Sequence, residues 1–282
     1  MQSNRAGFIT LTAMCAALYA VSIVAFSIIA TPWGIGHFRP TVVIPAFFAF
    51  LGGPWIAAIG AAIGTFLGDV VGLWPMGLSN PLLSLVAGVP ANFLGFLLFG
   101  YLIKRYNTLQ DFVWVTLLAL IVGNFIAGMG VAFSLGILIQ AVGDLSLTDR
   151  LMIAIGLMLY WVVTMLPFMY VLVPLLIRYL SPIMPMAIKM QSGEVPGIGV
   201  LAIFVGIILL AFSYLVGFPL KHFFVLYFNV EEAAIFSFIA GVSSIVLGAI
   251  SPRVYEKKDL EPFMFQQDFR VFFKFVTKVT EI

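Results

Sequence analysis

The chain has 282 residues, of which 62% are hydrophobic and only 9% are charged, and its formal net charge at pH 7 is +2. Because a soluble domain carries about 25% charged residues, this composition excludes a water-soluble fold. Long unbroken apolar stretches also exclude a membrane β-barrel, whose strands alternate between apolar and polar side chains. The composition therefore predicts an all-α fold, a polytopic membrane helical bundle, and no nucleic-acid partner.

Eight apolar stretches are candidates for membrane-spanning helices. They cover residues 8–30, 41–51, 54–72, 80–103, 112–140, 150–178, 197–218 and 232–251. The first is long enough to span, whereas the apolar core of a cleavable signal peptide has about 7–15 residues, so we expect an uncleaved helix. In this helix Cys15, the single cysteine, is expected to be a small packing residue. Ala13 and Ala17, four residues apart, either pack internally or offer a flat surface to another membrane protein.

The second stretch is too short for an upright span, which takes about 20 residues. Gly52-Gly53-Pro54 ends a helix and permits a tight reversal, so residues 40–72 are predicted to form a hairpin. Its first helix is short and interrupted by Pro45, and its second helix is rich in glycine. The four-residue spacing of glycines in the second helix predicts close helix packing near the centre of the bundle. These glycines are Gly60, Gly64 and Gly68.

Arg39, directly before the hairpin, and Asp69, near its end, carry the only two charges of residues 37–72. A helix rises about 1.5 Å per residue, so both residues reach the same membrane surface, on the order of 20 Å from the turn. Arg39 lies at a helix N-terminus and Asp69 near a helix C-terminus, where each charge opposes the helix dipole. Each therefore needs a partner. The pair is either purely structural or part of a functional site.

The placement of lysine and arginine gives an orientation, because these residues concentrate on the cytoplasmic side. With the hairpin counted as two spans and the N-terminus inside, three of the fourteen lie outside, namely Arg39, Arg150 and Lys221. The eleven inside are Arg5, Lys104, Arg105, Arg178, Lys189, Arg253, Lys257, Lys258, Arg270, Lys274 and Lys278. We therefore predict eight spans in the cell membrane, with both termini cytoplasmic.

Polar and aromatic side chains gather near the predicted outer surface and form a candidate small-molecule site. The candidates are Trp33, His37, Arg39, Asp69, Trp74, Asn80, Asn92, Asn124 and Trp161. Apolar walls with a few converging polar groups are typical of such sites. The alternatives are that the tryptophans belong to the interfacial belt and that Asn92 and Asn124 bond across helices. No cluster of residues has metal-ligand spacing, so no metal or cofactor is predicted.

The order of four motifs resembles the substrate-binding, or S, components of energy-coupling factor transporters, over residues 7–180. The first two motifs are Ala13-x-x-x-Ala17 and Thr31-Pro-Trp-Gly-Ile-Gly-His-Phe-Arg39-Pro40. The third is Phe50-Leu-Gly-Gly-Pro-Trp55, followed by the helix that ends in Gly68-Asp69. The fourth is Leu73-Trp-Pro-Met-Gly-Leu-Ser-Asn-Pro81, which opens the helix that ends at Gly100 and Lys104-Arg105. The resemblance implies a six-helix bundle that binds a vitamin-like nutrient near the outer face. It also implies that Ala13 and Ala17 meet a coupling membrane protein, which sits on a pair of ATPases.

The chain departs from that family by continuing after six helices. We predict a six-helix core at 1–180, two additional transmembrane helices at 181–255 and a cytoplasmic amphipathic tail at 256–282. In the tail, aromatic residues recur at helical spacing opposite basic ones, which is typical of a helix lying on the inner membrane surface. The rival interpretation is a segment that docks on a partner protein.

The sequence contains no Walker A motif, serine elbow, HExxH motif or paired carboxylates within one membrane plane, and it predicts no enzyme. Two functions remain. In the first, the protein binds a small nutrient and takes it up with an ATPase coupling module. In the second, it is a non-catalytic accessory or scaffold subunit of a larger membrane complex.

Overall fold

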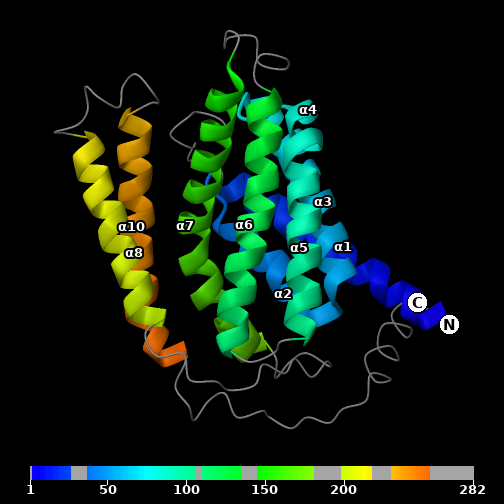
Figure 1. Cartoon of the computed structure of the whole chain (residues 1–282). Helices are drawn as coiled ribbons and strands as arrows, with labels where there is room; N and C mark the ends of the chain where they lie inside the picture. The colour runs from blue at the N-terminus through cyan, green and yellow to red at the C-terminus, as the bar shows by residue number, and fades with distance from the viewer. Residues whose placement is uncertain are drawn as a thin grey trace.

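The computed structural model describes residues 2–26, 37–105, 109–134, 145–180, 198–217 and 230–254, and Figure 1 shows a helical bundle. The helices are α1 (Gln2–Phe26), α2 (Val43–Gly52), α3 (Pro54–Leu67), α4 (Pro81–Leu83), α5 (Val89–Arg105), α6 (Leu109–Ser134), α7 (Leu147–Leu180), α8 (Ile198–Gly217) and α10 (Val230–Val254). Shorter segments are the 3-10 turns η1 (Pro40–Val42) and η3 (Trp74–Met76) and the π-helical turns η2 (Gly68–Leu73) and η4 (Ser84–Gly88).

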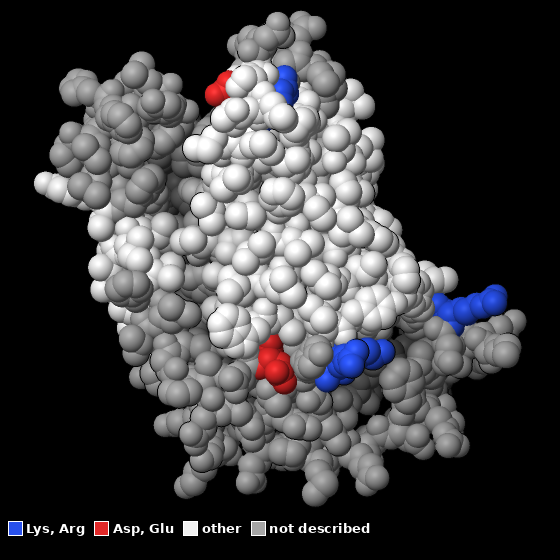
Figure 2. All heavy atoms as spheres, viewed as in Figure 1, with Lys and Arg blue, Asp and Glu red and all other residues white. Residues whose placement is uncertain are grey.

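Among the described residues, five helical segments are long and apolar enough to cross a membrane. They are Arg5–Phe26, Pro54–Met76, Pro81–Arg105, Asp111–Ser134 and Leu147–Ile177, and Pro40–Gly52 and Ser237–Ala249 are shorter apolar helices. In Figure 2 the described charged residues on the visible face lie near the two ends of the bundle and leave a wide uncharged band between them. The protein is therefore a multi-pass membrane protein built as an all-α bundle.

The hairpin predicted at 40–72 is present. Gly53 adopts φ +91°, a backbone conformation that suits glycine, and Pro54 begins α3. The prediction for Pro45 is corrected: Pro45 is the third residue of α2 and does not interrupt it. The first four amide groups of a helix have no partner within the helix, so a proline at this position costs no intrahelical hydrogen bond.

The glycines at four-residue spacing in α3 and at the start of η2 pack against α1, as their spacing predicts. A Cβ added at Gly60 would lie 2.6 Å from the Sγ of Cys15, and one added at Gly64 would lie 2.8 Å from the backbone oxygen of Ala16. A Cβ at Gly68 would come within 3.0 Å of Ile23. This face of α1 is buried against α3 and fixes the cysteine as a packing residue.

The opposite face of α1 is exposed and carries both alanines of the predicted docking motif, Ala13 and Ala17. Their role in binding a partner stays a prediction.

Helices α8 and α10 lie side by side and pack against α7 (Figure 1). The contact with α7 includes Val171 and Leu247, and a second cluster joins Leu209 and Ala240 to Phe38, the residue before Arg39. The division of the chain at 180 and 255 stays a prediction. The tail at 256–282 and Trp33 lie outside the described residues.

Candidate functional site

The bundle contains a cavity of about 290 Å³, close to the lower end of the range for small-molecule sites, roughly 300–1,000 Å³. One face of each of three helices lines it. These residues include Ala91, Gly95, Phe96 and Phe99 of α5, Thr116, Leu120, Asn124, Ala127 and Val131 of α6, and Trp161, Met165 and Met169 of α7. The lining along α6 covers four turns, roughly 22 Å, so the cavity is long and extends well into the bundle.

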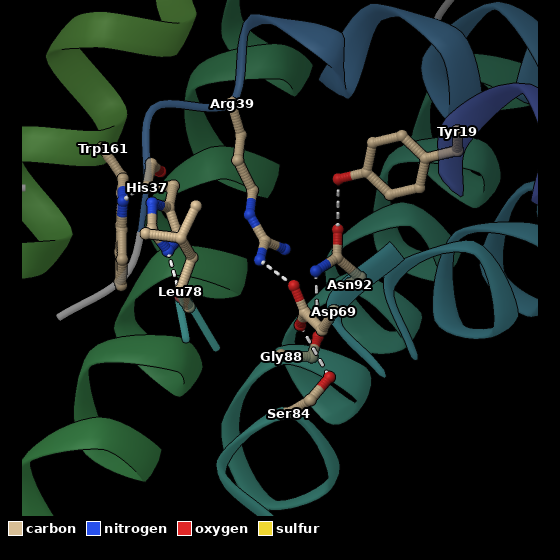
Figure 3. Close-up of polar contacts among 9 residues, drawn as sticks. All are labelled: Tyr19, His37, Arg39, Asp69, Leu78, Ser84, Gly88, Asn92 and Trp161. Carbon is tan, nitrogen blue, oxygen red and sulfur yellow. Dashed lines mark hydrogen bonds and ion pairs between the residues drawn. The ribbon is translucent and has the colours of Figure 1, made fainter. Parts of the chain in front are cut away.

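An ion pair lies in the wall of the cavity (Figure 3). The Nη2 of Arg39 donates to the Oδ1 of Asp69 at 2.7 Å, and the Oγ of Ser84 donates to the Oδ2 at 2.6 Å. Both oxygens of the Asp69 carboxylate are therefore occupied by donors. The Asp69 side chain is 4% exposed and the Arg39 side chain 15%, so the arginine is the more accessible of the two charges.

Asp69 and Ser84 both lie in π-helical turns, η2 and η4. Such turns insert an extra residue into a helix, re-aim the side chains that follow and frequently occur at functional sites. Gly88, at the end of η4, permits the close approach, because a Cβ there would lie 3.0 Å from Thr65 and 3.4 Å from the Oδ2 of Asp69. The two irregular turns together bring a hydroxyl and a carboxylate into contact across two helices.

A second polar cluster joins α1 to α5. The hydroxyl of Tyr19, a fully buried side chain, donates to the Oδ1 of Asn92 at 2.9 Å, and the Nδ2 of Asn92 donates to the backbone oxygen of Gly88 at 2.9 Å. Figure 3 shows this cluster beside the ion pair. Asn92 therefore both bonds across helices and lines the cavity.

His37 connects three parts of the wall. Its Nε2 bonds the backbone oxygen of Leu78 and therefore carries the proton, since a carbonyl only accepts. The Nε1 of Trp161 donates to the backbone oxygen of His37 at 3.2 Å. Nearby, the Oδ1 of Asn80 caps α4 by accepting from the amides of Leu82 and Leu83 at 2.9 and 3.3 Å. The bond from Trp161 ties the segment at 37–39 to α7, and the bond to Leu78 ties the segment at 77–80 to His37.

Two polar side chains line the cavity farther along α6. The Nδ2 of Asn124 contacts the Sδ of Met165 at 3.6 Å, a weak acceptor. Thr116 is fully buried, and its Oγ1 has no hydrogen-bond partner among the described residues. A buried polar group without a good partner costs about 1–3 kcal/mol, so the amide of Asn124, which is 8% exposed, is placed to bond an occupant of the cavity.

Seven of the nine predicted site residues line the cavity. They are His37, Arg39, Asp69, Asn80, Asn92, Asn124 and Trp161. Trp74 lies apart, in η3 and 55% exposed, which suits a side chain at a membrane interface. Trp33 lies outside the described residues. That any of these residues binds a ligand stays a prediction.

Four polar residues that line the cavity were missed by sequence reasoning: Tyr19, Ser79, Ser84 and Thr116. Tyr19 had a detectable signal, because it follows Cys15 by one helical turn on the same face. Ser84 had none, since its meeting with Asp69 depends on how two helices pack. No group of three or more His, Cys, Asp or Glu that could hold a metal occurs in the described part of the chain.

Chemically, the arrangement offers a long apolar chamber with an ion pair, amides and hydroxyls along its wall. It is equipped to bind and orient a small molecule. No known family model, no curated protein and no solved structure matches the chain.

Proposed function

We propose that the protein is a membrane-embedded subunit that binds a small, vitamin-like nutrient and takes it up together with an ATPase coupling module. The cavity lined by Arg39, Asp69 and Asn92 is the observation that carries this proposal. A helical bundle with a purely structural role is stabilised when side chains fill its interior, since close packing drives helix association in lipid. An open chamber with polar groups in its wall is the arrangement that ligand binding requires.

The same proposal orients the protein in the cell membrane with both termini in the cytoplasm. The turn at Gly53 and the end of α5 lie at one end of the bundle, because a Cβ at Gly53 would be 3.6 Å from the Nζ of Lys104. Lys104 and Arg105 make this the basic end, which the positive-inside tendency places in the cytoplasm. The segments at 37–39 and 77–80, which line the cavity, then lie toward the outer face.

In this proposal, α1 makes the contact with the coupling membrane protein that sits on the ATPases. In S components, which the sequence resembles, an alanine motif meets the coupling membrane protein. Here Ala13 and Ala17 lie on the exposed face of α1, opposite the face that packs on α3. Small side chains at this spacing let a partner helix approach closely.

A scaffold subunit of another membrane complex is the second candidate. The observation that favours it is the pair α8 and α10, which covers part of α7 and follows the region that resembles S components. In this case the pair would dock other subunits, and the cavity would hold no specific ligand.

The two candidates are separated by purifying the tagged protein from its own host in mild detergent. Mass spectrometry then identifies both the co-purifying chains and any small molecule released on denaturation. We expect a coupling membrane protein, ATPases and one recurring small molecule. Subunits of an unrelated membrane complex, with no recurring small molecule, would overturn the uptake proposal and support the scaffold.

Two matched variants test the cavity and the exposed face of α1 separately. Ala127→Leu enlarges a side chain in the cavity wall and is expected to remove the small molecule while leaving the co-purifying chains in place. Ala17→Leu makes the same change on the exposed face of α1 and is expected to lose the chains while the small molecule stays bound. Loss of both components in both variants would count against two separate surfaces.

A further inference from the structure

We infer that the ligand of this cavity carries no net charge and presents a hydrogen-bond acceptor, such as an amide or ring carbonyl, to Arg39. The inference rests on the proposed function and names the class of molecule that the site takes. Three observations support it: the balance of charge in the wall, the donors that Arg39 retains, and a neutral amide on α6.

The first observation is that the charges in the described wall cancel. Arg39 and Asp69 are the only Lys, Arg, Asp or Glu side chains among the residues that line the cavity. Since the two lie 2.7 Å apart, any charged ligand that approaches one of them meets the opposite effect of the other. A charged ligand would therefore lose its hydration for only a weakened attraction, whereas a neutral ligand pays no such penalty.

The second observation is that the more accessible hydrogen-bonding capacity of the pair consists of the donors of Arg39. Both oxygens of Asp69 already accept hydrogen bonds, from Arg39 and from Ser84, and its side chain is nearly sealed from the cavity. A guanidinium has five N–H donors; in the described part of the chain those of Arg39 meet Asp69 and the hydroxyl of Tyr19, which leaves others for a ligand. An acceptor on the ligand can therefore bond Arg39 without breaking the ion pair. A cation or a zwitterion would have to reach the sealed carboxylate.

The third observation is a neutral amide on α6, that of Asn124. Its Nδ2 contacts the Sδ of Met165, a weak acceptor, and the residue is 8% exposed. The amide can donate and accept hydrogen bonds and carries no charge. Apolar side chains, Phe96 and Leu120 among them, line the same cavity. The wall thus matches a neutral molecule that combines an apolar or aromatic body with polar atoms.

Three probes of nearly equal size test the inference: benzamide, benzoate and benzylammonium, which are neutral, anionic and cationic at pH 7. Binding to the full chain in lipid nanodiscs is measured by saturation-transfer NMR, and Ala127→Leu supplies the background from partition into lipid. We expect benzamide to bind at least about tenfold more tightly than either charged probe. Tighter binding of benzoate or benzylammonium would overturn the neutral-ligand inference and leave the binding function intact. Binding of none of the three above background would overturn the proposed binding function itself.

Asp69→Asn tests the physical reason for the preference. The substitution keeps the size and much of the hydrogen bonding of the side chain but removes the charge that balances Arg39. We expect the ratio of the benzamide and benzoate dissociation constants to shift by about tenfold in favour of benzoate. Asp149→Asn, an isosteric change at an exposed position outside the cavity lining, is the control and leaves the ratio unchanged. An unchanged ratio in Asp69→Asn would show that the charge balance does not select the ligand.

Discussion

Arg39 and Asp69 meet inside a membrane bundle, where a charge without a partner costs several kcal/mol. Their pairing removes that cost and, because Ser84 also bonds Asp69, the carboxylate keeps hydrogen bonds on both oxygens. The pair therefore stabilises the region where the segments around 39, 69 and 84 come together. It also leaves donors of Arg39 available to the cavity.

Removing one partner of the ion pair should lower the free energy of unfolding more than its share of the loss when both are removed. We expect Arg39→Ala and Asp69→Ala each to lower the free energy of unfolding by about 3 kcal/mol or more, because the other charge remains buried and unpaired. The double variant should cost less than the sum of the two. Titration with SDS in mixed micelles measures these differences. If both single variants are as stable as the wild type and bind ligand normally, the assignment of the pair to the site is wrong.

At the scale of whole elements, the α1–α3 contact depends on the absence of side chains on α3. The backbone of α1 at Ala16 lies so close to Gly64 that a single added carbon would sit 2.8 Å from a carbonyl oxygen, which has no rotamer to change. The two helices would have to separate to admit it. Close contact of this kind is what stabilises helix pairs in lipid.

Gly64→Ala should therefore destabilise the protein by about 2 kcal/mol, as overpacking of a well-filled contact does. Thermal unfolding in detergent provides the measurement. The matched control is Ala17→Val, which enlarges a small residue on the exposed face of α1 and should be nearly neutral. Equal stability of Gly64→Ala and the wild type would contradict the packing described for α1 and α3.

Helices α8 and α10 contact Phe38, which precedes Arg39 in the chain. This side chain is buried in a cluster with Leu209 and Ala240, and its ring meets Phe168 of α7 edge-on, 5.4 Å between centroids. Its chain neighbours, His37 and Arg39, line the cavity. The α8–α10 pair thus helps to hold the segment that presents Arg39.

Phe38→Ala should loosen this segment. We expect amide hydrogen exchange at residues 37–42 to accelerate by about tenfold or more, since the anchor that opposes local opening is lost. Phe125→Ala, at an exposed position on α6, is the control and should leave exchange at 37–42 unchanged. Unchanged exchange in Phe38→Ala would mean that α8 and α10 do not position the segment.

At the scale of the molecule, much of the fold could be predicted from the sequence. Apolar length locates the helices, and Gly52-Gly53-Pro54 locates the hairpin, because these patterns act through local backbone preferences. The meeting of Arg39 with Asp69 could also be predicted, since both ends of a hairpin reach one surface. Pro45 was misjudged because the start of α2 depends on the irregular turn before it.

The site was less predictable because it depends on how separate helices pack. The two π-helical turns, and with them the contact of Ser84 with Asp69, follow from packing that no short sequence pattern specifies. The cavity lined by Asn124 and Thr116 likewise depends on the distance between α5, α6 and α7. Trp74 fits the general enrichment of tryptophan at membrane interfaces better than it fits the cavity.

The central claim is that a small molecule occupies this cavity in the native membrane. The most direct measurement is an experimental structure of the protein extracted from its own host without added ligand. We expect non-protein density of a compact molecule in the cavity, in contact with Arg39 and reaching toward Asn124. Lining side chains that close the cavity, or a lipid acyl chain that fills it, would contradict the claim.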